Sequence, residues 1–125
     1  MSFASNIAGY AKRTGLSIDN AVVTICAEAS TSIIEMTPVD TGRARSNWFA
    51  TIGEASTATS ETRRDTDAIT GAITTAQKAS GKIFYLTNNL PYIIPLEYGH
   101  SKQARNPNGM VRITVEKISA SLKGF

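Results

Sequence analysis

The chain has 125 residues, of which 42% are apolar, and a formal net charge of +3 from 13 lysines and arginines against 10 aspartates and glutamates. That length suits one core, so we expect residues 1–125 to form a single domain. The lone cysteine, Cys26, excludes an intramolecular disulfide, and no signal peptide or apolar run of about 18 residues is visible. We therefore expect synthesis in the cytoplasm and no membrane contact.

Two helices are expected first along the chain. Residues 1–14 form an N-terminal arm or a short amphipathic helix. Residues 17–36 form a long helix, because Ser17 suits the N-cap, Asp19 suits the first turn and Pro38 disfavours helical dihedrals just before it. Steps of three and four residues predict one buried apolar stripe on this helix, made of Ile18, Val22, Ile25, Ala29, Ile33 and Met36.

A tight turn follows at residues 39–42, where the Asp40 side chain can accept backbone hydrogen bonds. Alternation across residues 43–50 then predicts a strand, and an initial helical turn through Arg45 stays open as an alternative. Trp48 lies on the opposite parity to the arginines, so we expect it in the core and the arginines exposed. A position at a subunit boundary is the second interpretation for Trp48.

The middle of the chain predicts a loop, a helix and a strand. Residues 54–66 are rich in serine, threonine and charge, so they are expected to form an exposed, mobile loop. Residues 67–78 have helical spacing, with Asp65 or Thr66 as the cap. Residues 82–87 are rich in β-formers and predict a strand.

The last third predicts a short helix over residues 92–98, which starts after Pro91 and ends at Gly99, followed by a polar loop over 100–108. Residues 110–122 predict a closing helix. Its inward residues are expected to be Val111, Val115, Ile118 and Leu122, and its outward ones Arg112, Glu116, Lys117 and Lys123. The fold expected from these elements is α+β, with a small antiparallel sheet packed by a long N-terminal helix and a C-terminal helix.

Catalytic chemistry finds little support in the residues. His100 is the only histidine, and no G-x-S-x-G motif accompanies it. One histidine and one cysteine fall short of the ligands that zinc needs, and the glycines form no phosphate loop. We expect no enzyme activity, no cofactor and no metal. A hydrolase built around His100 and Glu97 is the weakest alternative.

Three segments carry a family resemblance: TPVDTGRARSNW at residues 37–48, LTNNLPYIIPLEYGHS at 86–101 and PNGMVRITVEKI at 107–118. They are similar to the small neck proteins of long-tailed bacteriophages, the tail-component or tail-completion proteins that include the lambda Z-like minor tail proteins. The resemblance runs from about residue 17 to residue 120. Its most specific parts are P-V-D-T-G-R and P-Y-x-x-x-L-E-Y-G.

The resemblance implies a structural protein of the virion neck that completes the top of the tail and docks it to the head connector. It implies a closed ring of this chain, a hexamer, in contact with tail terminator or tail-tube proteins and with connector or stopper proteins. Phage DNA would pass through the lumen without sequence recognition, and the mild net charge suits that role because a strongly basic lumen would retain DNA.

Interface residues are expected in the first two segments and at Lys102, directly after the second one. The isolated carboxylate of Glu97 suggests a charge partner such as Arg43 or Arg45, either within one subunit or between neighbouring subunits. The residues expected at the subunit or docking interface are Arg43, Arg45, Trp48, Tyr92, Glu97, Tyr98, His100 and Lys102.

A nucleic-acid-binding module is the main alternative from another functional class. It would use the scattered basic side chains of Arg43, Arg45, Arg63, Arg64 and Arg105. Dedicated binders concentrate such charge on one stripe with aromatic partners, so a solvated mixed-charge surface is the favoured interpretation.

Overall fold

The computed structural model describes residues 3–38, 43–91, 93–97 and 109–123. Within them the elements are α1 (Phe3–Thr14), α2 (Ile18–Met36), the 3-10 helix η1 (Arg45–Asn47), β1 (Phe49–Ile52), α3 (Asp65–Ala76), β2 (Phe84–Thr87), α4 (Ile93–Glu97) and α5 (Met110–Lys123). The fold class is α+β, as predicted. The sheet has two antiparallel strands, with α3 inserted between them in the chain.

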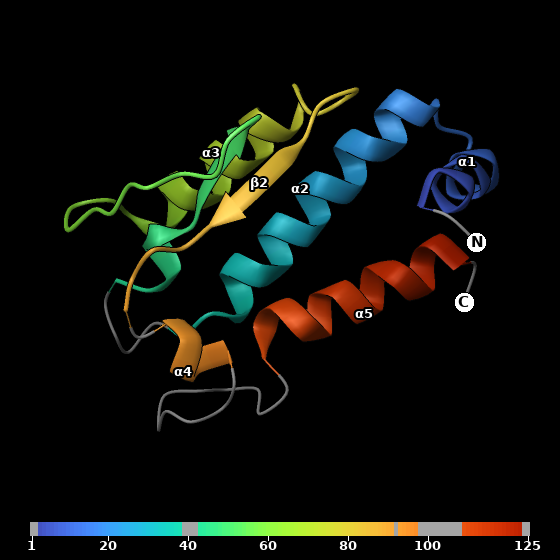
Figure 1. Cartoon of the computed structure of the whole chain (residues 1–125). Helices are drawn as coiled ribbons and strands as arrows, with labels where there is room; N and C mark the ends of the chain where they lie inside the picture. The colour runs from blue at the N-terminus through green and yellow to red at the C-terminus, as the bar shows by residue number, and fades with distance from the viewer. Residues whose placement is uncertain (1–2, 39–42, 92, 98–108, 124–125) are drawn as a thin grey trace.

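Helix α2 is the centre of the molecule. It has α3 and the sheet on one side and α1 and α5 on the other (Figure 1). Its predicted start is confirmed, because the Ser17 hydroxyl accepts a hydrogen bond from the Asn20 amide at 3.1 Å. Its predicted end is confirmed too, since Thr37 is already extended and Pro38 follows.

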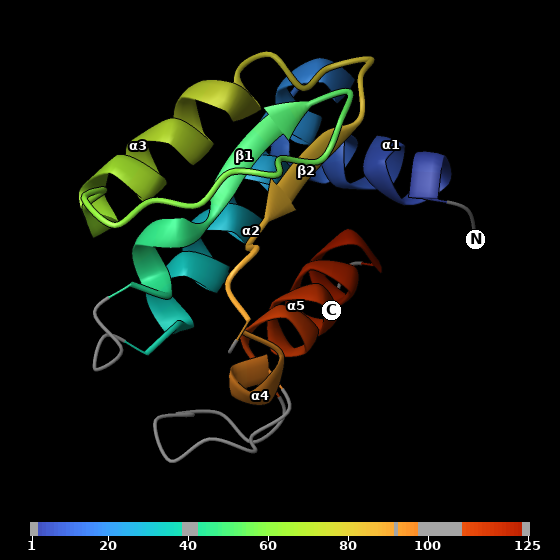
Figure 2. The same ribbon diagram turned by 60° about the vertical axis from the view of Figure 1, so that its left-hand side comes forward.

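The sheet begins later than the alternation predicted. A helical turn is present, but it runs over residues 45–47 and so begins at Arg45, where the alternative had it end, and β1 starts at Phe49. The side chains of Ser46 and Asn47 cause the difference, since both donate back to the Arg43 carbonyl, at 3.1 and 2.8 Å. Such local bonds compete with the strand ladder. From Phe49, paired with Thr87, the register runs regularly to Ile52, paired with Phe84 (Figure 2).

The core has two parts, one at each end of α2. The larger lies under the sheet and includes Trp48, which is 5% exposed, so its predicted core position is confirmed. Its buried residues are Ile33, Ile34, Ala44, Trp48, Ala68, Ala72, Ile93 and Met110. The smaller joins α1, the start of α2 and the end of α5 through Ile7, Ala11, Ala21, Ile25 and Leu122.

The single stripe predicted for α2 is partly wrong. Ile25 and Ile33 are buried, but Ile18 is 55% exposed. A single stripe is typical of a surface helix. Because α2 lies between two layers, it buries Ala21, Ser30 and Ile34 as well.

On α5, the predicted inward residue Val115 is 55% exposed, and its neighbour Thr114 is buried instead. The Thr114 and Ser32 hydroxyls form a hydrogen bond at 2.9 Å. At this turn of α5, therefore, the side chain that points toward α2 is the polar Thr114 and not Val115. Leu122 is buried as predicted, and Val111 and Ile118 are partly buried. The predicted outward positions Arg112, Glu116 and Lys117 are exposed.

Helix α3 begins at Asp65, so neither predicted cap residue stands at its N-cap. Arg64 occupies the N-cap, and its backbone amide donates to the Asp67 carboxylate at 2.9 Å. The negative charges of Asp65 and Asp67 in the first turn complement the helix dipole. No helix in the described residues is long and apolar enough to cross a membrane.

Candidate functional site

The first candidate residue, Arg45, fastens the C-terminal end of α2. Its Nε donates to the Thr37 carbonyl at 2.9 Å, and a terminal guanidinium nitrogen donates to the Glu35 carbonyl at 2.7 Å. The last carbonyls of a helix have no partner within the helix, and a cation there also complements the helix dipole. Arg45 therefore has a role within the fold that the sequence analysis did not predict.

Trp48 reaches the same helix end from below the sheet. Its indole Nε1 donates to the Thr37 hydroxyl at 2.9 Å, and that hydroxyl donates to the Ile33 carbonyl at 2.7 Å. Both side chains are buried, so the chain of two hydrogen bonds satisfies polar groups that would otherwise be costly to desolvate. Arg45 and Trp48 thus both bind Thr37, which connects the two ends of the first segment of the resemblance.

Asn47 binds the loop that leaves the sheet. Its side-chain amide donates to the Ser60 carbonyl at 2.9 Å and accepts from the Ser60 amide at 2.7 Å. This pair of bonds is the pattern that a neighbouring strand would offer. Asn47 is fully buried, so the loop over residues 54–66 has an anchor at Ser60. The mobility expected for the rest of that loop stays a prediction.

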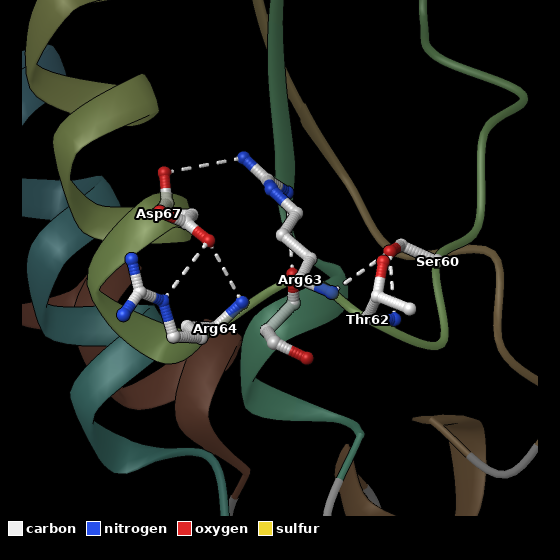
Figure 3. A network of polar contacts seen from close by, with 6 residues as sticks. Ser60, Thr62, Arg63, Arg64 and Asp67 are labelled. Atoms are coloured by element: carbon white, nitrogen blue, oxygen red, sulfur yellow. Dashed lines mark hydrogen bonds and ion pairs between the residues drawn. The ribbon is translucent and has the colours of Figure 1, made fainter.

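Arg63 packs back across the start of β1. Its guanidinium lies 4.1 Å from the centroid of the Phe49 ring and donates to the Trp48 carbonyl at 2.7 Å. Figure 3 shows the side chain reaching toward Asp67, whose carbonyl accepts at 3.4 Å, while the carboxylate of Asp67 faces Arg64. Burial lowers the pKa of the Arg63 guanidinium, and the Asp67 charge opposes that shift.

The second segment of the resemblance meets the first through two asparagines. Asn88 donates to the Ala44 carbonyl at 2.8 Å. Asn89 donates to the carbonyls of Ser56 and Ala58, at 2.9 and 3.1 Å. The two asparagines after β2 therefore bind both the residue before η1 and the loop after β1.

Glu97 joins the second segment to the third. Its carboxylate accepts from the backbone amides of Val111 and Arg112, at 2.9 and 3.1 Å, in the first turn of α5. The Arg112 guanidinium closes the contact, with Nε 3.2 Å from the carboxylate and a terminal nitrogen 2.7 Å from the Glu97 carbonyl. Within the described part of the chain the charge partner of Glu97 is therefore Arg112, and the expected pairing with Arg43 or Arg45 inside one subunit is wrong. A pairing between subunits stays a prediction. The signal for Arg112 was its place in the first turn of a helix that follows a glycine, Gly109.

The other predicted interface residues fall into two groups. Arg43 is half-buried, as Arg45 is, so the prediction that these two arginines are exposed is wrong. Arg43 donates to the Ser60 carbonyl at 3.5 Å. Tyr92, Tyr98, His100 and Lys102 lie outside the described residues, as do the predicted turn at 39–42 and the predicted helix end at Gly99.

The described residues offer binding and positioning chemistry. They contain no group of three or more histidine, cysteine, aspartate or glutamate side chains that could hold a metal ion. Of the arginines considered for nucleic acid, Arg45 and Arg63 donate to backbone carbonyls of their own chain. Arg64 remains highly exposed, with 81% of its side chain accessible, and Arg105 lies outside the described residues.

Sequence analysis missed Asn47, Ser60 and Arg63 as organising residues. Each acts through contacts between segments far apart in the chain, and a buried asparagine has no periodic signature. No protein-family model, no curated protein and no solved structure matches the chain.

Proposed function

We propose that this chain is a structural subunit of a phage neck, which forms a ring, completes the top of the tail and docks it to the head connector. The resemblance of three sequence segments is the source of this proposal. It carries with it a virion location, tail terminator or tail-tube proteins and head connector or stopper proteins as partners, and passage of DNA through the lumen without base recognition.

One observation carries the proposal furthest: the three segments of the resemblance are hydrogen-bonded to one another. Asn88 of the second binds the Ala44 carbonyl of the first, and Glu97 of the second binds the amide of Val111 in the third. These hydrogen bonds fix the positions of the three segments relative to one another. Fixed segments suit a protein whose surface must hold a set geometry. A subunit that docks to partners on two sides would have that requirement.

Within this proposal, three of the predicted interface residues act indirectly. Arg45, Trp48 and Glu97 make hydrogen bonds inside the subunit, at the end of α2 and the start of α5. We propose that they position the connections over residues 39–42 and 98–108, and that direct docking contacts come from those connections. Charges there would steer encounter and set register more than they add affinity.

Electron microscopy of the purified protein, alone and mixed with isolated phage tails, tests the proposal. Rings alone, or density added at the head-proximal end of the tails, are the expected results. An oligonucleotide shift at low salt with no rings and no tail binding would favour the nucleic-acid module instead. Hydrolytic activity that His100→Ala abolishes would favour the enzyme alternative.

A further inference from the structure

An open groove follows the C-terminal half of α2. Its volume is about 620 Å³, and α3 and α5 contribute one wall residue each, Ile73 and Lys117. Met36 and Ala27 give it apolar lining, and Ile73 is 42% exposed. Because the groove is open along its length, it suits a protruding piece of protein better than an enclosed small molecule.

The groove has an acidic character that the whole chain lacks. Glu28 and Glu35 both line it and are exposed, two helical turns apart on α2. Lys117 is the one basic residue in its described lining. An occupant that combines apolar side chains with positive charge would complement this surface.

An exposed turn that combines apolar and basic side chains exists elsewhere on the same chain. The turn between α3 and β2 carries two exposed lysines, Lys78 and Lys82, followed by Ile83, which is 63% exposed. Hydrogen bonds keep this turn tight, from the Lys78 amide to the Thr75 carbonyl and from the Lys82 amide to the Ala79 carbonyl, each at 3.0 Å. We call residues 78–83 the basic turn.

The basic turn and the groove lie at different ends of α2. The Ser80 hydroxyl contacts the Asp19 carboxylate at 2.6 Å, which sets the turn beside the first turn of α2, where Ile18 is also exposed (Figures 1 and 2). Asp19 and Glu35 are separated by about 24 Å along the helix at 1.5 Å per residue. Glu28, at the near end of the groove, is about 13.5 Å from Asp19 by the same rise. None of residues 78–83 lines the groove, so the basic turn of a subunit, fixed at Asp19, leaves the groove of that subunit open.

We infer that the groove of one copy receives the basic turn of the next copy. Ile83 would enter beside Ile73 and Met36, and Lys78 and Lys82 would face Glu28 and Glu35. Two different surfaces of the same chain then meet head to tail, a heterologous contact that closes into a ring when its rotation closes. The inference deepens the proposed function, because it rests on a ring of this chain and names the surfaces that build it.

Reversal of charge on each surface tests the contact. The variant E28K/E35K changes only the groove, and K78E/K82E changes only the basic turn. Each variant alone should associate with a dissociation constant raised roughly a hundredfold, because like charges then face each other. Light scattering across a concentration series gives this constant. E61K reverses an exposed carboxylate away from both surfaces and should associate as the unaltered protein does.

An equimolar mixture of the two reversed variants gives the decisive result. Each contact between the two different variants joins either two unaltered surfaces or two reversed ones, so the mixture should recover oligomers that neither variant forms alone. Recovery is the expected outcome, and circular dichroism verifies that each variant is folded. Rings that survive both reversals would overturn this contact but leave the neck proposal standing. A monomeric unaltered protein that still binds tails would do the same, whereas the absence of both rings and tail binding would overturn both proposals.

Discussion

Glu97 supplies the helix cap that Gly109 lacks. Gly109 precedes α5 and has no side chain, and its carbonyl accepts from the Ile113 amide at 3.1 Å, as an N-cap residue does. The carboxylate of Glu97 accepts the hydrogen bonds of the Val111 and Arg112 amides in its place. The glycine has a φ of 85°, and a Cβ at this position would overlap the Glu97 carboxylate and carbonyl. The two residues bracket the connection over 98–108, so their contact holds its two ends together.

Gly109→Ala should destabilise the fold by about 2–4 kcal/mol, because it adds a strained positive φ to a steric overlap. Gly81→Ala is the matched control, since Gly81 has a φ of 72° but open space where the Cβ would stand. That control should cost only about 1 kcal/mol. Urea unfolding measures both. Equal losses in the two variants would contradict the contact between Gly109 and Glu97.

Arg45→Ala should lower the free energy of unfolding by about 1–2 kcal/mol, because it leaves two carbonyls at the end of α2 without their charged donor. Arg64→Ala removes the same charge from a highly exposed side chain and should change stability by no more than about 0.5 kcal/mol. Indistinguishable thermal unfolding of the two variants would show that Arg45 does not cap α2. Arg45→Glu should be worse still, since it sets a negative charge at a helix C-terminus.

The amide of Ser60 should exchange more slowly with solvent than that of Thr59, because the Asn47 side chain accepts from it at 2.7 Å. Asn47→Ala should abolish that protection and free the loop. It should also cost about 1–3 kcal/mol, since it leaves the Ser60 amide without its acceptor and removes one donor each from the Arg43 and Ser60 carbonyls. Hydrogen exchange followed by NMR gives the residue-level answer. Strong protection across the whole of residues 54–66 would contradict the predicted mobility of this loop.

Ile25→Ala and Ile33→Ala should each cost about 2–4 kcal/mol, through lost apolar burial and the cavity left behind. The two residues belong to different parts of the core, so both parts should respond. Ile18→Ala is the control on the same helix, and its exposed side chain should make the change cost under about 1 kcal/mol. Should Ile18→Ala cost as much as the buried pair, the assigned orientation of α2 would be wrong.

Local patterns in the sequence determined most of the secondary structure. Ser17 and Pro38 mark the ends of α2, β-formers mark β2, and helical spacing marks α3 and α5. Each of these signals acts through a residue's own backbone or its near neighbours, so it can be read from a short window of sequence.

Tertiary structure alone decided which face of each helix is buried and which groups are partners. Ile18 and Val115 fit an apolar period but are exposed, because α2 lies between two layers and Thr114 turns α5 toward Ser32. The partners of Arg45 and Glu97 depend on helix ends brought near them by the fold. A charged side chain forms hydrogen bonds with the unpaired backbone groups of any helix end that the fold brings close to it. Composition and residue spacing do not show which helix end that will be.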